Sequence, residues 1–205
     1  MKNNAIRKAI PITILLSLVL VIYMLIISNR IQSFDNGVYN IISKTISEPL
    51  TIFAKIVTTI GSAYVIGPLG IILTIIFWKK GYGKYILISL CIIVLINQGL
   101  KFMIQRPRPI QNSLIIENGF SFPSGHSMVS MAFYGDIIYL IYKNVKNNYL
   151  KWFSIGFLSL IIILIGLSRI YLGVHYASDV LAGFLISVAY LSIKCRLLVN
   201  IIVLK

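Results

Sequence analysis

The sequence is poor in charged residues, and acidic residues are especially scarce. Only 12% of the 205 residues are charged against 58% that are hydrophobic, and five Asp and Glu stand against 19 Lys and Arg. A typical soluble domain has about a quarter of its residues charged, so this composition excludes one. Apolar runs of about 17 or more residues recur instead, as in membrane-spanning helices. We therefore expect one integral membrane domain over residues 1–205 and no soluble module.

Cysteine is scarce too, which limits the chemistry open to the chain. Cys91 and Cys195 lie in or at the end of apolar runs, so we expect free thiols rather than a disulfide framework or a metal site. The five acidic residues are scattered along the chain. With no carboxylate cluster to hold a metal ion, the sequence predicts metal-free chemistry and no cofactor.

The net charge of +14 does not indicate a nucleic-acid partner. Proteins that bind nucleic acid gather Lys and Arg in a patch or stripe, and this chain has no such stripe with interleaved aromatic residues. Its basic residues lie mainly in short gaps between apolar runs, where the positive-inside rule explains them. We expect the bilayer, and no nucleic acid, to be the partner.

The apolar runs predict an all-α, polytopic fold with six transmembrane helices. These lie at about 9–28, 62–78, 85–104, 127–142, 152–168 and 174–194. The first follows basic residues, as a signal peptide does, but it is long and lacks a small-x-small cleavage site, so we expect it to be retained. The fourth is short and carries Asp136. An intramembrane acid marks a transport pathway or, more simply, pairs with a polar group on a neighbouring helix.

Residues 33–60 are too polar to span a membrane, but they show helical periodicity. The apolar positions at helical spacing are Leu50, Phe53, Ile56, Val57 and Ile60. This pattern predicts an amphipathic helix in the outer interface. Glu48 and Pro49 are a suitable start for it.

Basic residues also predict the orientation of the chain. With six spans, the two termini, the 79–84 turn and the 143–151 loop share one side, which carries twelve of the 19 basic residues and none of the acidic ones. This side is expected in the cytoplasm. The opposite face, with residues 29–61, 105–126 and 169–173, is then expected to look outward.

Two polar clusters on the outer face begin helices or end them. Lys101 stands at the end of the third span, and flanking prolines hold Arg108 on an extended segment; taken alone, both could be cations that snorkel at a membrane boundary. The segment Pro123-Ser124-Gly125-His126 precedes the fourth span. A helix start favours an anion, Gly125 allows close approach, and His126 can transfer a proton near neutral pH. The simpler explanation is an N-cap formed by Ser124.

The third cluster runs from Ser168-Arg169 to His175 and Asp179. His175 and Asp179 are four residues apart, so on a helix they share one face. A carboxylate that bonds one ring nitrogen fixes the tautomer and the aim of the other, as in a Ser-His-Asp triad. A purely structural His–Asp pair is the alternative. Together the clusters place Lys101, Arg108 and Arg169 around a helix start, which describes a phosphate clamp.

The pattern Lys101…Arg108-Pro109, Pro123-Ser124-Gly125-His126 and Ser168-Arg169…His175…Asp179 resembles that of the type 2 phosphatidic acid phosphatase superfamily. That superfamily also includes the vanadium haloperoxidases. No motif position departs from the pattern, and the motifs extend over about residues 101–179. The six-span layout extends the likeness over the chain and suggests a bacterial plasma-membrane enzyme with its site facing outward.

The resemblance implies a lipid-phosphate phosphatase that works through a phosphohistidine intermediate. His175 would be the nucleophile, Asp179 its support, and His126 the acid that protonates the leaving oxygen and then the base that activates water. The phosphate oxygens would be held by Lys101, Arg108, Arg169, Ser124 and the Gly125 N–H. Phosphatidylglycerol phosphate, undecaprenyl pyrophosphate and phosphatidic acid are the substrates that such enzymes suggest.

Two other functions fit the pattern less well. A vanadate-dependent peroxidase is disfavoured because those relatives are soluble and this chain has no soluble domain. A non-enzymatic lipid-binding or transport protein would be favoured by an incomplete motif, and the motif is complete. The sequence indicates neither the lipid nor the oligomeric state. Outer-loop residues that could shape the head-group pocket are Gln111, Glu117, Asn118 and Phe120.

Overall fold

The chain is a bundle of helices in the computed structural model, which describes residues 2–109 and 113–203. The elements are α1 (Lys2–Ile27), α2 (Gln32–Ser43), α3 (Glu48–Ile60), α4 (Ala63–Ile76), α5 (Tyr82–Ile104), α6 (Gly125–Asn144), α7 (Asn148–Tyr171) and α8 (Ala177–Val203). These residues form no strand, so the all-α prediction is confirmed. The segments long and apolar enough to cross a membrane are Ala9–Ile27, Glu48–Ile76, Tyr82–Ile104, Asn148–Tyr171 and Ala177–Cys195.

The fourth predicted span, 127–142, is helical in α6 but is not among those five segments. α6 packs against α5, α7 and α8, so protein rather than lipid covers much of its surface. Covered in this way, it can carry buried polar residues such as Ser130 and Asp136. Lys194 on α8 donates to the Asp136 carboxylate at 2.6 Å. This pair is the simpler of the two explanations expected for Asp136.

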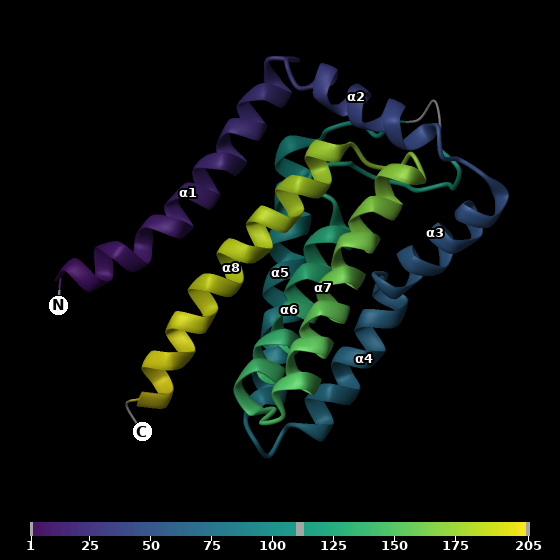
Figure 1. The fold of residues 1–205 in the computed structure, drawn as a ribbon. Helices are drawn as coiled ribbons and strands as arrows, with labels where there is room; N and C mark the ends of the chain where they lie inside the picture. Colours follow the sequence, from purple (N-terminus) through teal and green to yellow (C-terminus); the bar gives the residue numbers. More distant parts are fainter. Residues whose placement is uncertain (1, 110–112, 204–205) are drawn as a thin grey trace.

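The predicted interfacial region, 33–60, forms two helices rather than one. α2 lies across one end of the bundle (Figure 1). α3 begins at Glu48, as expected, but after a break at Gly61 and Ser62 it leads into α4, and the two form one candidate span. The polarity of α3 is partly satisfied by protein, because Thr58 accepts a hydrogen bond from Arg169 and Thr51 bonds the hydroxyl of Tyr171.

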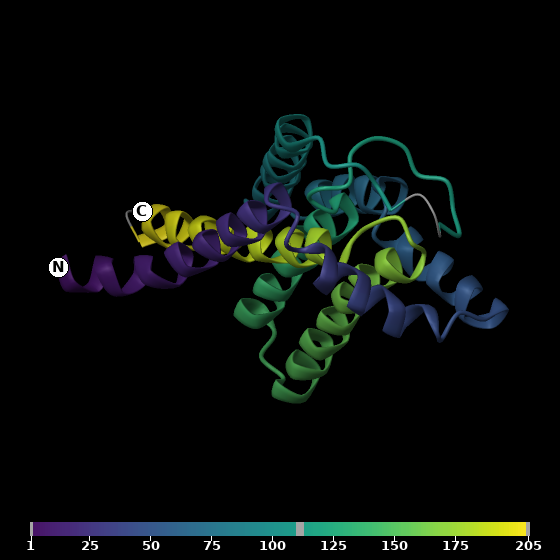
Figure 2. The same ribbon diagram turned by 90° about the horizontal axis from the view of Figure 1, so that it is seen from above.

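The core gathers around α6, at the centre of the bundle. Phe133 and Tyr134 belong to a buried cluster with Ile66, Ile86 and Ile165 from three neighbouring helices. α1 packs along α8 at the side of the molecule (Figure 2). Cys91 and Cys195 are free thiols, as expected from the sequence.

The connections between helices define two ends of the bundle. The links 77–81 and 145–147 lie at the end opposite α2 (Figure 1). The α2 end receives the segment that follows α5, the start of α6 and the link between α7 and α8. All three polar clusters of the sequence therefore reach the same end of the bundle.

Candidate active site

Backbone hydrogen bonds tie the three clusters to one another. The Ser124 N–H donates to the Asp179 carbonyl at 3.1 Å, which joins the start of α6 to α8. The Ser121 N–H donates to the Arg106 carbonyl at 2.8 Å, which joins the same segment to the end of α5. Because backbone bonds fix these approaches, the side chains of the clusters are held in one place.

His175 is buried, and its two ring nitrogens face different charged groups, although Nδ1 forms no hydrogen bond within the described part of the chain. Nδ1 lies 3.5 Å from Asp179 Oδ2, and Nε2 lies 3.0 Å from Arg108 Nη1. Because a guanidinium can only donate, Nε2 accepts, and the ring proton is on Nδ1, toward Asp179. His175 precedes α8 instead of lying in it, so the expected pair forms at the entry to the helix.

Burial lowers the pKa of His175 to about 4, although Asp179 acts to raise it. Arg108 and Arg169 add to the lowering because their positive charges disfavour imidazolium. The ring is therefore neutral at pH 7. A neutral imidazole with a lone pair on Nε2 and a carboxylate behind Nδ1 is chemically suited to act as a nucleophile.

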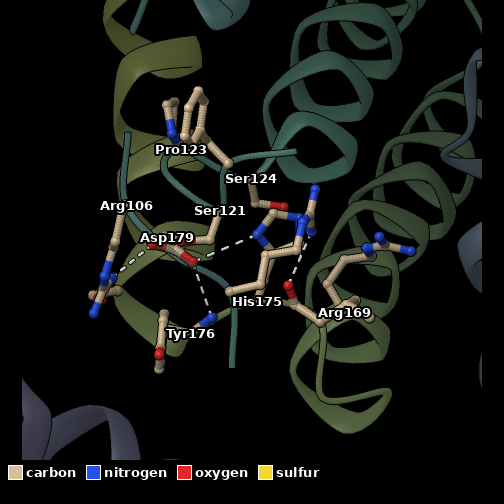
Figure 3. A network of polar contacts seen from close by, with 12 residues as sticks. Arg106, Ser121, Pro123, Ser124, Arg169, His175, Tyr176 and Asp179 are labelled. Atoms are coloured by element: carbon tan, nitrogen blue, oxygen red, sulfur yellow. Dashed lines mark hydrogen bonds and ion pairs between the residues drawn. The ribbon is translucent and has the colours of Figure 1, made fainter. Parts of the chain in front are cut away.

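Asp179 is held from the other side by Arg106, a residue that is not among the site residues predicted from the sequence motifs. Arg106 Nη1 donates to Asp179 Oδ1 at 2.7 Å, as Figure 3 shows. Its Nη2 donates to Asp35 Oδ2 on α2, also at 2.7 Å, and the guanidinium lies 4.0 Å from the ring centroid of Tyr176. Both carboxylates are fully buried at their side chains. Arg106 is thus a bridge between the two acids.

Ser178 completes this bridge. Its N–H and hydroxyl donate to the two oxygens of Asp35 at 2.9 and 2.8 Å, and its hydroxyl also accepts from Arg106. The Tyr176 N–H donates to Asp179 Oδ2 at 3.0 Å. Hydrogen bonds from Arg106 and the Tyr176 N–H thus fix the orientation of the Asp179 carboxylate, and the Arg106 guanidinium balances its negative charge. α2 is thereby attached to the site through Asp35.

Two of the predicted cations, Lys101 and Arg108, face the same space as His175. Lys101 Nζ donates to the Phe120 carbonyl at 2.5 Å. Arg108 donates to the carbonyls of Gly119, Asn118 and Val174 at 2.9 to 3.0 Å. These bonds leave Arg108 with its guanidinium beside the imidazole. Both cations can therefore reach an anion next to Nε2.

The third predicted cation, Arg169, is buried beneath Glu117. Its Nη1 donates to Thr58 Oγ1 at 2.8 Å and its Nη2 pairs with Glu117 Oε2. Arg169 Nε has no hydrogen-bond partner within the described part of the chain. Arg169 therefore keeps one unused donor.

Residues of the segment from Pro123 to His126 have different roles: Ser124 caps α6, whereas Gly125 and His126 border a cavity. Ser124 is fully buried, and its hydroxyl accepts from the Ser127 N–H and hydroxyl as the N-cap of α6. Asn97 Nδ2 donates to the Pro123 carbonyl at 3.2 Å and ties the segment to α5. Gly125 and His126 follow the cap in the first turn, where N–H groups lack intrahelical partners. The Ser124 side chain therefore acts as the N-cap of α6, which was the simpler of the two interpretations of this segment.

A cavity of about 480 Å³ joins these groups to an apolar groove. Five predicted site residues line it: Lys101, Arg108, Gly125, His126 and His175. Ser124, Asp179 and Arg169 are not among its lining residues. Its apolar walls come from α4, α5 and α6 and include Ile66, Leu90, Val94, Phe102 and Val129.

The outer loop contributes to the same cavity. Glu117, Asn118 and Phe120 line it, so three of the four outer-loop residues singled out in the sequence border the cavity. Gln111, the fourth loop residue singled out, lies outside the described residues. The polar end of the cavity is thus bounded by this loop, and the groove continues between the helices.

Comparison with known sequences identifies a family and individual relatives of this chain. The sequence profile of the PAP2 superfamily matches residues 82–200, more than half of the chain. Phosphatidylglycerophosphatase B of Bacillus subtilis (strain 168) is 34% identical over 165 residues, which cover 77% of this chain and 79% of that protein. Undecaprenyl-diphosphatase of Sulfolobus acidocaldarius is 26% identical and covers 89% of each chain.

Solved structures extend the likeness to the fold. A transmembrane PAP2-type phosphatidylglycerolphosphate phosphatase from Bacillus subtilis matches with a TM-score of 0.86 at 29% identity, over 93% of this chain and 96% of that one. LpxE from Aquifex aeolicus matches with a TM-score of 0.63 at 27% identity, over 77% and 93%. Profile, relatives and fold confirm the family that the motifs indicated: the chain belongs to the PAP2 superfamily.

Proposed function

We propose that the protein is a membrane lipid phosphatase that hydrolyses a phosphomonoester or the terminal phosphate of a lipid pyrophosphate. The observation that carries this proposal is the cavity with two unlike ends. At one end a neutral imidazole stands beside Arg108 and Lys101; at the other, apolar side chains of three helices form a groove. A phosphate group fits the first end and an acyl or prenyl chain the second.

In the proposed first step, His175 Nε2 attacks phosphorus and the bond from phosphorus to the leaving oxygen breaks. The electron pair of that bond stays on the leaving oxygen, which takes a proton from His126. Burial and the charge of Arg169 lower the pKa of His126 to about 3, so the ring takes up this proton together with the phosphate dianion, whose negative charge raises the pKa. Asp179 stabilises the positive charge that develops on the phosphorylated imidazole. Arg108 must release Nε2 for this attack, and a bound phosphate offers its guanidinium a stronger acceptor.

In the second step, His126 removes a proton from water as the water attacks the phosphohistidine. The bond from phosphorus to Nε2 breaks, its electron pair returns to His175, and inorganic phosphate is the product. Fixed cations and the N–H groups at the start of α6 stabilise the charge on the phosphoryl oxygens in both steps. The protein's main contribution is then positioning and electrostatics.

Among substrates, we propose phosphatidylglycerol phosphate first and undecaprenyl pyrophosphate second. The relative at 34% identity is named a phosphatidylglycerophosphatase, and the one at 26% an undecaprenyl-diphosphatase. Phosphatidic acid carries the same kind of terminal phosphate and belongs in the same test. Phosphate release from these three lipids in detergent micelles should give the highest kcat/KM for phosphatidylglycerol phosphate.

The same assay separates an enzyme from a lipid-binding protein. We expect hydrolysis to continue in EDTA, because the groups placed to neutralise the phosphate are Lys and Arg side chains. Orthovanadate should inhibit, because it mimics the five-coordinate phosphoryl state. Loss of activity in EDTA that Mg²⁺ restores would contradict the proposed chemistry. Lipid binding without any phosphate release would favour the non-enzymatic alternative.

An outward-facing site makes a separate prediction about the loop near Ile116. This side chain is 93% exposed, so a cysteine placed there is accessible to a reagent. In a background without Cys91 and Cys195, Ile116→Cys should react with an impermeant thiol reagent in intact cells, because the distribution of basic residues predicts that the opposite face lies in the cytoplasm. A cysteine at Lys80 is the matched control and should react only after lysis. The reverse pattern would overturn the orientation.

A further inference from the structure

Glu117 occupies the place where the phosphate oxygens are expected to bind. Its Oε2 pairs with Arg169 Nη2, and its Oε1 lies 4.0 Å from Arg108 Nη2. One carboxylate thus spans two of the three cations assigned to the substrate. Carboxylates and phosphates present the same kind of acceptor oxygens to a guanidinium, so the two groups compete for these donors.

Glu117 also stands between Arg169 and the cavity. Glu117 lines the cavity, whereas Arg169 does not. The Arg169 side chain is only 1% exposed. Arg169 can therefore reach a phosphate in the cavity only if the Glu117 carboxylate moves. Exchange of the Glu117 carboxylate for a phosphate group would give the unused Nε–H of Arg169 an acceptor. A carboxylate has two oxygens, and a phosphoryl group brings a third acceptor.

Glu117 keeps its negative charge beside the two arginines. Burial alone would raise the pKa of Glu117, but the charges of Arg169 and Arg108 hold it below its ordinary value. At neutral pH the carboxylate is therefore an anion. A phosphate that entered beside it would face a like charge in a partly buried site, which is unfavourable.

The neighbouring chain leaves the Glu117 side chain room to turn. Leu114 and Ile115 pack against a buried cluster, and the Leu114 N–H donates to the Leu172 carbonyl, so the backbone before Glu117 is anchored. The Glu117 side chain itself is 29% exposed. Rotation about its own bonds can carry the carboxylate toward solvent without moving the anchored segment.

From these contacts we infer that Glu117 is an internal counter-anion that covers Arg169 until a dianionic phosphate group displaces it. The inference rests on the proposed function and adds to it an explanation of which lipids the site accepts. A phosphomonoester or terminal pyrophosphate brings two negative charges and replaces the carboxylate. A phosphodiester lipid brings one, and gains nothing over Glu117 in exchange. The abundant diester lipids of a membrane are thereby kept out of the site.

Glu117→Gln tests this role, because it removes the charge and keeps the shape. Purified variants would be assayed in detergent micelles on dioctanoyl phosphatidic acid, with inorganic phosphate, orthovanadate or phosphatidylglycerol as inhibitors. We expect the inhibition constant for inorganic phosphate and for vanadate to fall by about tenfold in Glu117→Gln, since an opposing charge is gone. Phosphatidylglycerol should inhibit the variant and leave the wild-type protein unaffected. Glu48→Gln, the same change at an exposed position on α3, should match the wild type.

Calorimetric titration with inorganic phosphate separates the two proposals. Wild-type protein that neither hydrolyses lipid phosphates nor binds inorganic phosphate or vanadate would refute the proposed function and this inference with it. An active wild type whose phosphate affinity equals that of folded Glu117→Gln would refute the inference alone. Weaker phosphate binding in the variant would do the same and would make Glu117 a support for the arginines. Should Glu117→Gln fail to fold, Glu117→Asp keeps the charge on a shorter side chain and should bind phosphate more tightly than the wild type.

Discussion

His175→Ala should reduce phosphate release from a lipid phosphate to the background rate of a reaction without enzyme. The imidazole is the proposed site of covalent chemistry, and it lies between Asp179 and Arg108. Its neutral form at pH 7 follows from the burial that lowers its pKa to about 4. Phosphate release by purified protein, compared at equal folded concentration, measures the loss.

His126→Ala should show a different loss, one that depends on the leaving group. A lipid alkoxide needs a proton as it leaves, whereas p-nitrophenolate hardly does. General acid catalysis is worth about 10²- to 10⁴-fold, so we expect a loss of that size on a lipid phosphate and a much smaller one on p-nitrophenyl phosphate. His175→Ala should lose both activities equally.

Rapid-quench trapping then assigns the two roles. Because His126 also activates water in the second step, phosphoenzyme should accumulate in His126→Ala after a fast first step. Acid-labile phosphate is expected on His126→Ala and none on His175→Ala. Phosphate trapped in His175→Ala would show that the two histidines have been assigned the wrong way round.

The sequence predicted the family, and it predicted that the three polar clusters meet at one end of the bundle, because the relevant residues lie in short motifs. Lys101 and Arg108 flank one helix end, and His126 lies two residues after the cap Ser124 and three after the helix breaker Pro123. Such signals depend on local backbone chemistry, which a single sequence carries. The antiparallel link before His175 was also predictable, since a short connection between two spans leaves no other path.

Arg106 was missed because its role depends on two distant segments. Asp35 lies 71 residues before it and Asp179 lies 73 residues after it, and no periodic pattern connects them. In the sequence, Arg106 looks like one more basic residue beside Pro107 at a membrane boundary. α6 was difficult for a related reason, since its composition reflects burial among three helices and not contact with lipid. Tertiary environment decided both cases.

Arg106→Met should be among the most destabilising substitutions in the protein. It leaves Asp35 and Asp179 as buried carboxylates without their shared cation. Removing one partner of a buried ion pair costs about 3–5 kcal/mol, because the remaining charge stays uncompensated. We expect a lower thermal unfolding temperature in detergent and a lower kcat per folded molecule, since Asp179 loses the group that orients it. Asp35→Asn should lower stability less, because Arg106 keeps Asp179 as its partner.

A pH profile distinguishes positioning from stability alone. Removing a cation near the His175–Asp179 pair favours the protonated imidazole, so the pKa of His175 should rise from its value of about 4. The acid limb of kcat/KM should therefore move to higher pH in Arg106→Met. Asp136→Asn is the matched control, because it breaks the largely buried pair with Lys194 away from the site and should lower stability while the acid limb stays in place. If Arg106→Met unfolds at a lower temperature but keeps the wild-type kcat and acid limb, Arg106 supports only the fold.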